Sequence, residues 1–288
     1  MEEIEKIIEL ENVTKDYGDF RLDGVSFSVP KGSVCGFIGQ NGAGKTTTIR
    51  LILDVICRDA GEIRVFGEDV GKDSARLREQ IGVVFDEMGF HEFMTGRDLN
   101  IMMKNIYKEW DEEAFFGYLR QFALPMKKPC GTFSRGMRMK LQIAAAMSHH
   151  AKLLIMDEPT SGLDPIVRNE MLEIFRQFVV AEDHTILLSS HITGDIEKLA
   201  DEVVFIDRGR IVLSGNKDEI LERHGLLKCR RNEAEGVSAS LVVHRELGRY
   251  GAELLVNDRR AAERLYPGMV VEPATLEEIM IHYVNAKR

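Results

Sequence analysis

The chain has 288 residues and a mass of 32.6 kDa, enough for one large domain or two smaller ones. Hydrophobic residues make up 44% and charged residues 30%, a balance that excludes a disordered or collagen-like chain. The formal net charge is −9, from 38 basic and 47 acidic residues, so we expect no nucleic acid among its partners.

Two further features indicate the compartment. Four cysteines lie far apart without CxxC spacing, which is typical of free thiols in a reducing environment. No apolar run approaches the roughly 18 residues needed to cross a bilayer, and the acidic start differs from a basic secretion signal. We therefore expect a cytoplasmic protein without a membrane span of its own.

Strand-like and helix-like stretches alternate over residues 1–222, which we take as one domain. The strand candidates are two runs within 24–38, then 63–67, 81–85, 153–156, 185–190, 203–207 and 211–213. The helix candidates are 45–56, 98–107, 111–122, 134–149, 167–180 and 192–199. This order predicts an α/β core with a mostly parallel sheet and a helical insert over about residues 88–150.

Residues 223–288 have a different pattern. Short strand-like runs stand at 240–243, 252–256 and 268–273, and Thr275-Leu276-Glu277-Glu278 offers a capping box for a last helix. We expect a small C-terminal α+β appendage.

The pattern GxxxxGK[ST] is matched at every fixed position after a strand and at the start of a helix, the context of a phosphate-binding loop (P-loop, Walker A). The expected nucleotide-binding residues of this loop are Gly39, Gln40, Asn41, Gly42, Ala43, Gly44, Lys45, Thr46 and Thr47. Its backbone N–H groups and the helix N-terminus surround phosphate, Lys45 neutralises phosphate charge, and the Thr46 hydroxyl ligates Mg²⁺. The loop predicts binding of ATP with Mg²⁺ in a P-loop NTPase core.

A second element is the apolar run 153–156, which ends in Asp157 and Glu158. A strand of this kind places Asp157 beside the metal and Glu158 beside the γ-phosphate, where it can polarise water as a general base.

With these motifs in order, residues 1–222 resemble the nucleotide-binding subunits of ATP-binding cassette (ABC) transporters. Phe133-Ser134-Arg135-Gly136-Met137 stands at the place of the family signature, and Ser161-Gly162-Leu163-Asp164 at the place of its dimer-contact loop. His191 matches the switch histidine, and Tyr17 the aromatic residue that stacks on adenine, with Phe20 as the alternative. The S-R-G-M form is similar to bacterial exporter ATPases with separate permeases, of the antibiotic-resistance and acetoin-operon types.

The resemblance implies catalytic roles for Glu158, His191 and Lys45. It also implies pairing of two cassettes, as a homodimer or a heterodimer, with Ser134 and Gly136 contacting the ATP of the opposite subunit. The insert then receives a multi-span membrane permease, and the subunit lies on the inner face of the cell membrane. A soluble or regulatory ABC-type ATPase that is not coupled to transport is the alternative.

Three residues depart from the family pattern. In the signature, Arg135 replaces the first Gly and Met137 replaces the Gln, and Asp86 stands where the family has a metal-contacting Gln. A carboxylate can ligate Mg²⁺, so Asp86 joins Thr46 and Asp157 as an expected metal ligand. The other interpretation is that Asp86 is too short to reach the metal and caps or solvates its loop.

Overall fold

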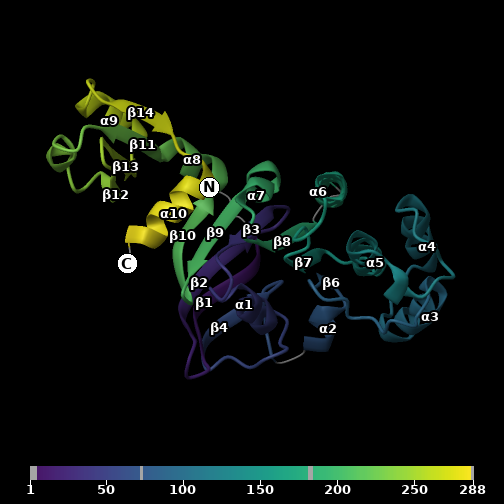
Figure 1. The fold of residues 1–288 in the computed structure, drawn as a ribbon. Coiled ribbons are helices and arrows are strands. Elements are labelled where there is room, and N and C mark those ends of the chain that lie inside the picture. The colour runs from purple at the N-terminus through teal and green to yellow at the C-terminus, as the bar shows by residue number, and fades with distance from the viewer. Residues whose placement is uncertain (1–4, 72–73, 181–183, 287–288) are drawn as a thin grey trace.

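The computed structural model describes residues 5–71, 74–180 and 184–286 (Figure 1). Its centre is a six-stranded sheet that includes the runs expected at 81–85, 153–156, 185–190 and 203–207. In spatial order its strands are β10 (Arg210–Asn216), β9 (Glu202–Asp207), β3 (Val34–Ile38), β8 (Thr185–Ser190), β7 (Leu153–Asp157) and β6 (Ile81–Val84). All neighbours except β10 and β9 pair in parallel, which confirms the mostly parallel α/β core. The carboxyl ends of β3, β6, β7 and β8 therefore meet at one edge.

A second, antiparallel sheet lies beside the first. Its order is β2 (Arg21–Pro30), β1 (Lys6–Asp16), β4 (Ala60–Val65) and β5 (Glu68–Asp69). The sequence did not predict β1, which is the strand that joins β2 to β4.

Helices cover both faces of the central sheet. Around it lie α1 (Lys45–Ile52), α2 (Ser74–Arg78), α6 (Pro165–Val180), α7 (Thr193–Leu199) and α8 (Lys217–Arg223). The expected insert is formed by α3 (Gly96–Ile106), α4 (Glu112–Gln121), a short 3-10 helix (Cys130–Thr132) and α5 (Arg135–Met147). Each of its three α-helices begins on a side chain that accepts a backbone N–H, those of Thr95, Asp111 and Ser134.

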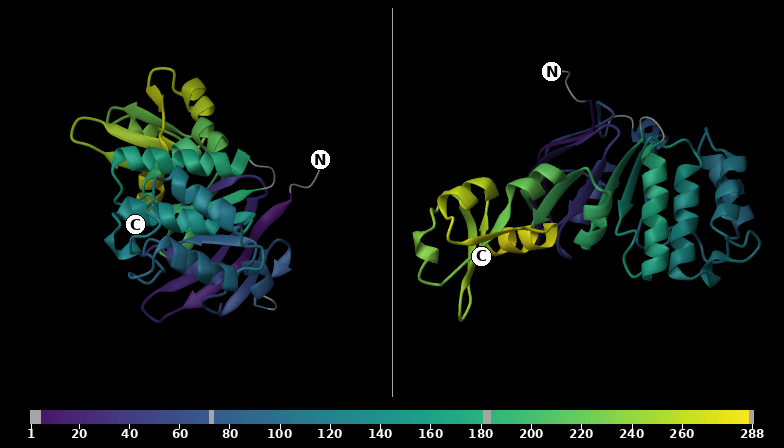
Figure 2. Two further views of the ribbon diagram at one scale, coloured as in Figure 1. Left: turned by 90° about the vertical axis from the view of Figure 1, so that its right-hand side faces the viewer. Right: turned by 90° about the horizontal axis from the view of Figure 1, so that it is seen from above.

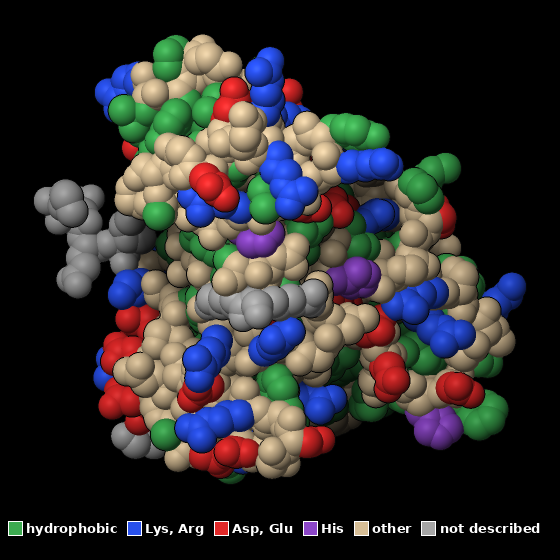
Figure 3. Space-filling view, turned by 60° about the vertical axis from the view of Figure 1, so that its left-hand side comes forward, with side chains coloured by type: hydrophobic (Ala, Val, Ile, Leu, Met, Phe, Trp, Pro, Cys, Tyr) green, Lys and Arg blue, Asp and Glu red, His purple; other side chains and the backbone are tan. Residues whose placement is uncertain are grey.

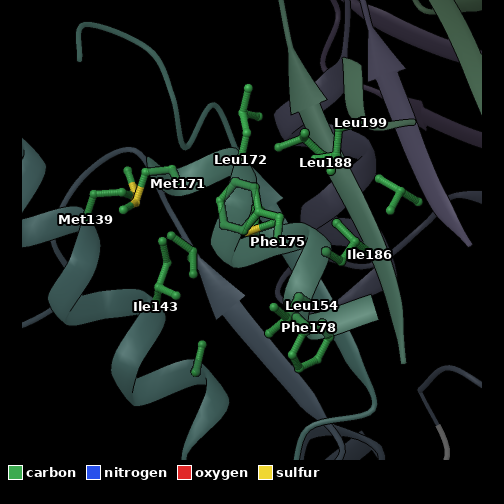
Figure 4. Packing of buried hydrophobic residues seen from close by; sticks show 14 of the residues in the cluster. Met139, Ile143, Leu154, Met171, Leu172, Phe175, Phe178, Ile186, Leu188 and Leu199 are labelled. Carbon is green, nitrogen blue, oxygen red and sulfur yellow. The ribbon is translucent and has the colours of Figure 1, made fainter. Parts of the chain in front are cut away.

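The core divides on the two faces of the sheet. Along β7, Leu153 and Ile155 join the hydrophobic cluster on the α1 side, whereas Leu154 and Met156 join the cluster with α5 and α6. Figure 4 shows Phe175 of α6 packed among side chains of the strands and of α5. Because β7 is buried on both faces of the sheet, packing holds it in place together with the polar residues at its carboxyl end.

The appendage is built on an antiparallel sheet. Its order is β12 (Val242–Leu247), β13 (Ala252–Val256), β11 (Gly225–Cys229) and β14 (Val270–Pro273), with a 3-10 helix (Ala234–Gly236), α9 (Arg259–Leu265) and α10 (Leu276–Ala286). The expected capping box of α10 forms, because the Thr275 and Glu278 side chains bond each other's backbone N–H groups. The expected division near residue 223 coincides with the end of α8 and stays a prediction.

The helical insert and the appendage lie at opposite ends of the molecule, with the central sheet between them (Figures 1 and 2). Acidic and basic side chains are interspersed over the face in Figure 3. Across the three described ranges, no helix combines the length and the apolar character that a bilayer crossing requires.

Candidate nucleotide-binding site

The glycine-rich loop connects β3 to α1. Gly44, directly before the helix, has φ +117°, and a Cβ there would lie 3.0 Å from Leu22 Cδ1 and 3.1 Å from Phe20 Cζ. A Cβ at Gly39 would come within 2.5 Å of the Ile206 carbonyl oxygen in β9. Glycine is therefore required at both ends of the loop, by conformation at one end and by close packing at the other.

Lys45, the first residue of α1, is held inside this loop. Its Nζ donates to the carbonyl oxygens of Gly39 (2.6 Å) and Gln40 (3.3 Å), although the side chain is only 6% exposed. The same Nζ lies 3.1 Å from Glu158 Oε1. Among the ion pairs of the described chain, Glu158 is thus the one carboxylate close to the Lys45 ammonium.

Asp157 lies at the end of β7 beside the helix that carries Thr46. The Thr46 hydroxyl donates to Asp157 Oδ2 (2.7 Å), and the Ser189 hydroxyl donates to Asp157 Oδ1 (2.5 Å). The parallel pairing of β7 with β8 sets Asp157 opposite Ser189. The Asp157 carboxylate is therefore oriented by a hydroxyl group on each side.

Glu158 follows immediately and has a left-handed backbone conformation, with φ 52°. Its N–H lies 3.1 Å from Ser189 Oγ and 3.2 Å from the Ser189 carbonyl oxygen. Its Oε2 lies 2.7 Å from His191 Nδ1, and its buried Oε1 lies 3.1 Å from Lys45 Nζ. A carboxylate held in this way beside the phosphate loop can accept a hydrogen bond from water, as a general base does.

These groups open onto a cavity of about 340 Å³. It is lined by Phe20, Gln40, Asn41, Gly42, Gly44, Lys45, Thr46, Thr47 and Glu158. Tyr17 is half exposed, with Lys15 Nζ 5.7 Å from its ring centroid, and does not line the cavity. Phe20, the alternative aromatic residue, lines it, so the choice of the adenine-stacking residue stays a prediction.

The signature segment is not part of this cavity. Ser134 is the N-cap of α5 and accepts the N–H of Met137 at 3.3 Å. A Cβ at Gly136 would lie 2.9 Å from Val167 Cγ1, so α6 requires a glycine there. Within one chain Ser134 caps a helix and Gly136 packs against α6, and the expected contact of both residues with nucleotide stays a prediction.

Asp86 has a different partner from the residues around Asp157. Its carboxylate accepts a hydrogen bond from the Arg135 guanidinium, and both residues line another cavity, of about 440 Å³, beside α5. Contacts of the described chain link Lys45 with Glu158 and His191, and Thr46 with Asp157, whereas the metal contact expected of Asp86 stays a prediction.

Sequence reasoning missed Ser189, which contacts both carboxylate residues of the site. The signal was that two apolar strands, β7 and β8, both end in polar residues. In a parallel pair the carboxyl ends lie side by side, which places Ser189 beside Asp157.

The fold and the loop together define a P-loop ATP-binding cassette. A solved structure of the "ATP binding subunit of ABC transporter" superimposes with a TM-score of 0.68 at 28% identity, covering 74% of this chain and 91% of that chain.

The sequence comparisons give the family. The family model for ABC transporters matches residues 22–161. The bacitracin transport ATP-binding protein BcrA of Bacillus licheniformis is 37% identical, over 76% of this chain and 72% of that protein. The daunorubicin/doxorubicin resistance ATP-binding protein DrrA of Streptomyces peucetius is 34% identical, over 84% and 76%. The chain belongs to the ATP-binding proteins of ABC transporters, the subunits that bind and hydrolyse ATP to power transport.

Proposed function

We propose that this subunit drives an exporter and that its catalytic centre is the cluster of Lys45, Thr46, Asp157, Glu158 and His191. The observation that carries the proposal is that the Glu158 carboxylate contacts two residues at the carboxyl edge of the sheet. Its Oε1 lies 3.1 Å from Lys45 Nζ, and its Oε2 lies 2.7 Å from His191 Nδ1. Export is supported by the relatives, whose names describe bacitracin transport and daunorubicin/doxorubicin resistance.

In this proposal the loop from Gly39 to Thr47 binds the phosphates of ATP. Its glycines admit close approach, and Lys45 supplies the cation. Glu158 accepts the proton of the attacking water, and His191 fixes the carboxylate through Oε2. Since Lys45 Nζ lies 3.1 Å from Glu158 Oε1, a phosphate that binds in the loop competes with that carboxylate for the same ammonium.

Thr46 of α1 and Asp157 at the end of β7 fit Mg²⁺. This ion usually binds through one or two protein oxygens together with phosphates and water, so it needs no cage of protein ligands. The Thr46 hydroxyl and the Asp157 carboxylate lie 2.7 Å apart and are such oxygens. Asp86 can join them only if its ion pair with Arg135 opens. When bound, the metal neutralises phosphate charge.

Assembly is the remaining part of the proposal. The chain works as one of two paired cassettes, identical or different, with Ser134 and Gly136 of each facing the nucleotide of the other. A multi-span permease binds the helical insert and holds the subunit at the inner face of the cell membrane. The position of the insert at one end of the molecule, far from the appendage, supports this arrangement (Figure 2).

The test is Glu158→Gln. We expect hydrolysis to slow by about 10²-fold or more, the usual scale for loss of a general base. ATP affinity should be equal or higher, because the variant removes the carboxylate that competes for Lys45. With ATP and Mg²⁺ the variant should elute from gel filtration as a dimer, since bound ATP is no longer consumed.

The control is Glu173→Gln, an exposed glutamate of α6 outside the site, which should hydrolyse ATP as the parent does. Unchanged turnover in Glu158→Gln contradicts the catalytic role. A Glu158→Gln protein that stays monomeric with ATP and Mg²⁺ contradicts pairing of identical cassettes.

A further inference from the structure

Two of the residues that depart from the family pattern, Asp86 and Arg135, contact each other. The Arg135 guanidinium donates to the Asp86 carboxylate, and both side chains are about half exposed. The guanidinium also lies against Gly162, where a Cβ would stand 3.2 Å from its Cζ, Nε and Nη1 atoms. One side chain at the start of α5 therefore touches the segment after β6 and the loop before α6.

A second polar contact also attaches α5 to the residues that follow β6. Seven residues further along the helix, Gln142 Nε2 donates to the Phe85 carbonyl oxygen at 3.1 Å. Seven residues are about two helical turns, so Arg135 and Gln142 lie on the same face. Gln142 is buried and anchors the middle of the helix, whereas the Arg135 pair fixes its N-terminal end.

The charges of Asp86 and Arg135 stabilise each other at the N-terminal end of α5. A cation in the first turn of a helix opposes the positive end of its dipole, and the first turn of α5 carries no acidic residue. Asp86 supplies the missing negative charge from another segment. With Gln and Gly at these positions, as in the family pattern, neither charge exists and neither needs a partner.

We propose that Asp86 is a positioning residue: through its ion pair with Arg135 it fixes the direction in which the N-terminus of α5, with Ser134 and Gly136, faces the nucleotide of the second subunit. Asp86 and Arg135 are thus a matched pair of substitutions. This inference rests on the proposed function, because it assigns a further residue to the same paired site.

Loss of one charge leaves the Gln142 anchor in place and lets the end of the helix turn about it. The phosphate loop should keep its geometry, since the hydrogen bond and ion pair between Asp86 and Arg135 involve no residue of that loop. Turnover should therefore fall while binding of ATP to the single subunit does not change.

The experiment is a double-substitution cycle on the full chain, with kcat for ATP and the dissociation constant of ATP as readouts. We expect Asp86→Gln and Arg135→Gly each to lower kcat about tenfold, within the scale of a misplaced contact group. If the two residues acted independently, the losses would multiply to about a hundredfold. We expect instead that the double variant Asp86→Gln/Arg135→Gly, which restores the family residues at these two positions, recovers kcat to within about threefold of the parent.

The matched control is Glu170→Gln. Glu170 is as exposed as Asp86 and also pairs with a cation of α5, Lys140, at 2.6 Å, but on another part of the helix. This variant should keep the parent kcat. A charge exchange, Asp86→Arg with Arg135→Asp, gives a second test, in which partial recovery over either single substitution is expected.

Three results would overturn the inference. The first is multiplication of the single effects in the double variant, and the second is a raised ATP dissociation constant in the single variants. The third is a rise in the Mg²⁺ concentration for half-maximal turnover in Asp86→Asn that persists when residue 135 is Gly, which identifies Asp86 as a metal ligand. Inactivity of the parent itself contradicts the proposed function and is thus distinct from all three.

Discussion

At the scale of single residues, the site depends on one serine that orients two acids. Ser189 donates to Asp157 and accepts the N–H of Glu158, and it is fully buried in β8. Glu158 needs this support, because a residue with a side chain at φ 52° is held in a conformation that costs about 1–3 kcal/mol. The geometry of the proposed metal ligand and of the proposed base therefore comes from a neighbouring strand.

The first prediction here is that Ser189→Ala lowers kcat about tenfold or more while leaving ATP bound. Alanine removes the donor to Asp157 and leaves the Glu158 N–H with the Ser189 carbonyl oxygen alone. Turnover at saturating ATP and Mg²⁺ measures the effect. Thr185→Val, at the other end of the same strand and equally buried, is the control and should lose stability without the loss in kcat. Equal kcat losses in the two variants would show that Ser189 acts through the fold alone.

The same residues show what a sequence can and cannot predict about a site. Lys45, Thr46, Asp157 and Glu158 stand in two motifs that identify them, and the family resemblance identifies His191. Their partners do not follow from spacing. The contact of Ser189 with Asp157 depends on the register of β7 against β8, and that of Asp86 with Arg135 on the packing of α5 against β6.

At the scale of elements, strands with an apolar run were predictable and those without one were not. The sequence missed β1, whose alternation is interrupted at Asn12, with φ 51° and a register shift between Leu10 and Val13. It also missed β11, five residues that become a strand between β13 and β14, and the short helices α8 and α9. These elements are stabilised by packing against neighbouring strands and helices, and the local sequence pattern carries no information about those neighbours.

The junction of α8 with α10 contains a pH-sensitive contact. His224 follows α8 and is 1% exposed; its Nδ1 lies 2.8 Å from the Ile220 carbonyl oxygen and its Nε2 3.0 Å from the Tyr283 hydroxyl of α10. Burial lowers the pKa of His224 below its ordinary value of 6.5. The unfolded chain therefore binds the proton at a higher pH than the folded one does.

We expect the free energy of unfolding to decrease as the pH falls below about 6.5, because the unfolded state then takes up the proton that the folded state excludes. His149 and His244, whose pKa values burial also lowers, act in the same direction. Thermal denaturation at pH 7.5 and 5.5 measures the loss for the parent and for His224→Gln, and the variant should lose less on acidification. An identical loss in both proteins would remove His224 from this effect.

At the scale of the whole molecule, the appendage shares its core with the cassette. In its sheet, Leu227 and Leu254 face a small separate cluster, whereas Leu226 and Leu255 face the large cluster that continues into the central sheet. Ile279 of α10 joins that large cluster together with Ile196 and Leu199 of α7. The pair of α8 and β11 links the parts along the chain, and this apolar contact links them in space.

A shared core predicts that both parts unfold together. Ile279→Ala removes a fully buried side chain, a change that typically costs about 2–5 kcal/mol. In calorimetry we expect a single transition for the parent and a shift of that whole transition to lower temperature in the variant, by several degrees. Ile281→Ala on the same helix is the control, because Ile281 is 44% exposed and its loss should move the transition little. Two transitions, of which Ile279→Ala moves only the smaller, would show instead that the appendage unfolds as a separate unit.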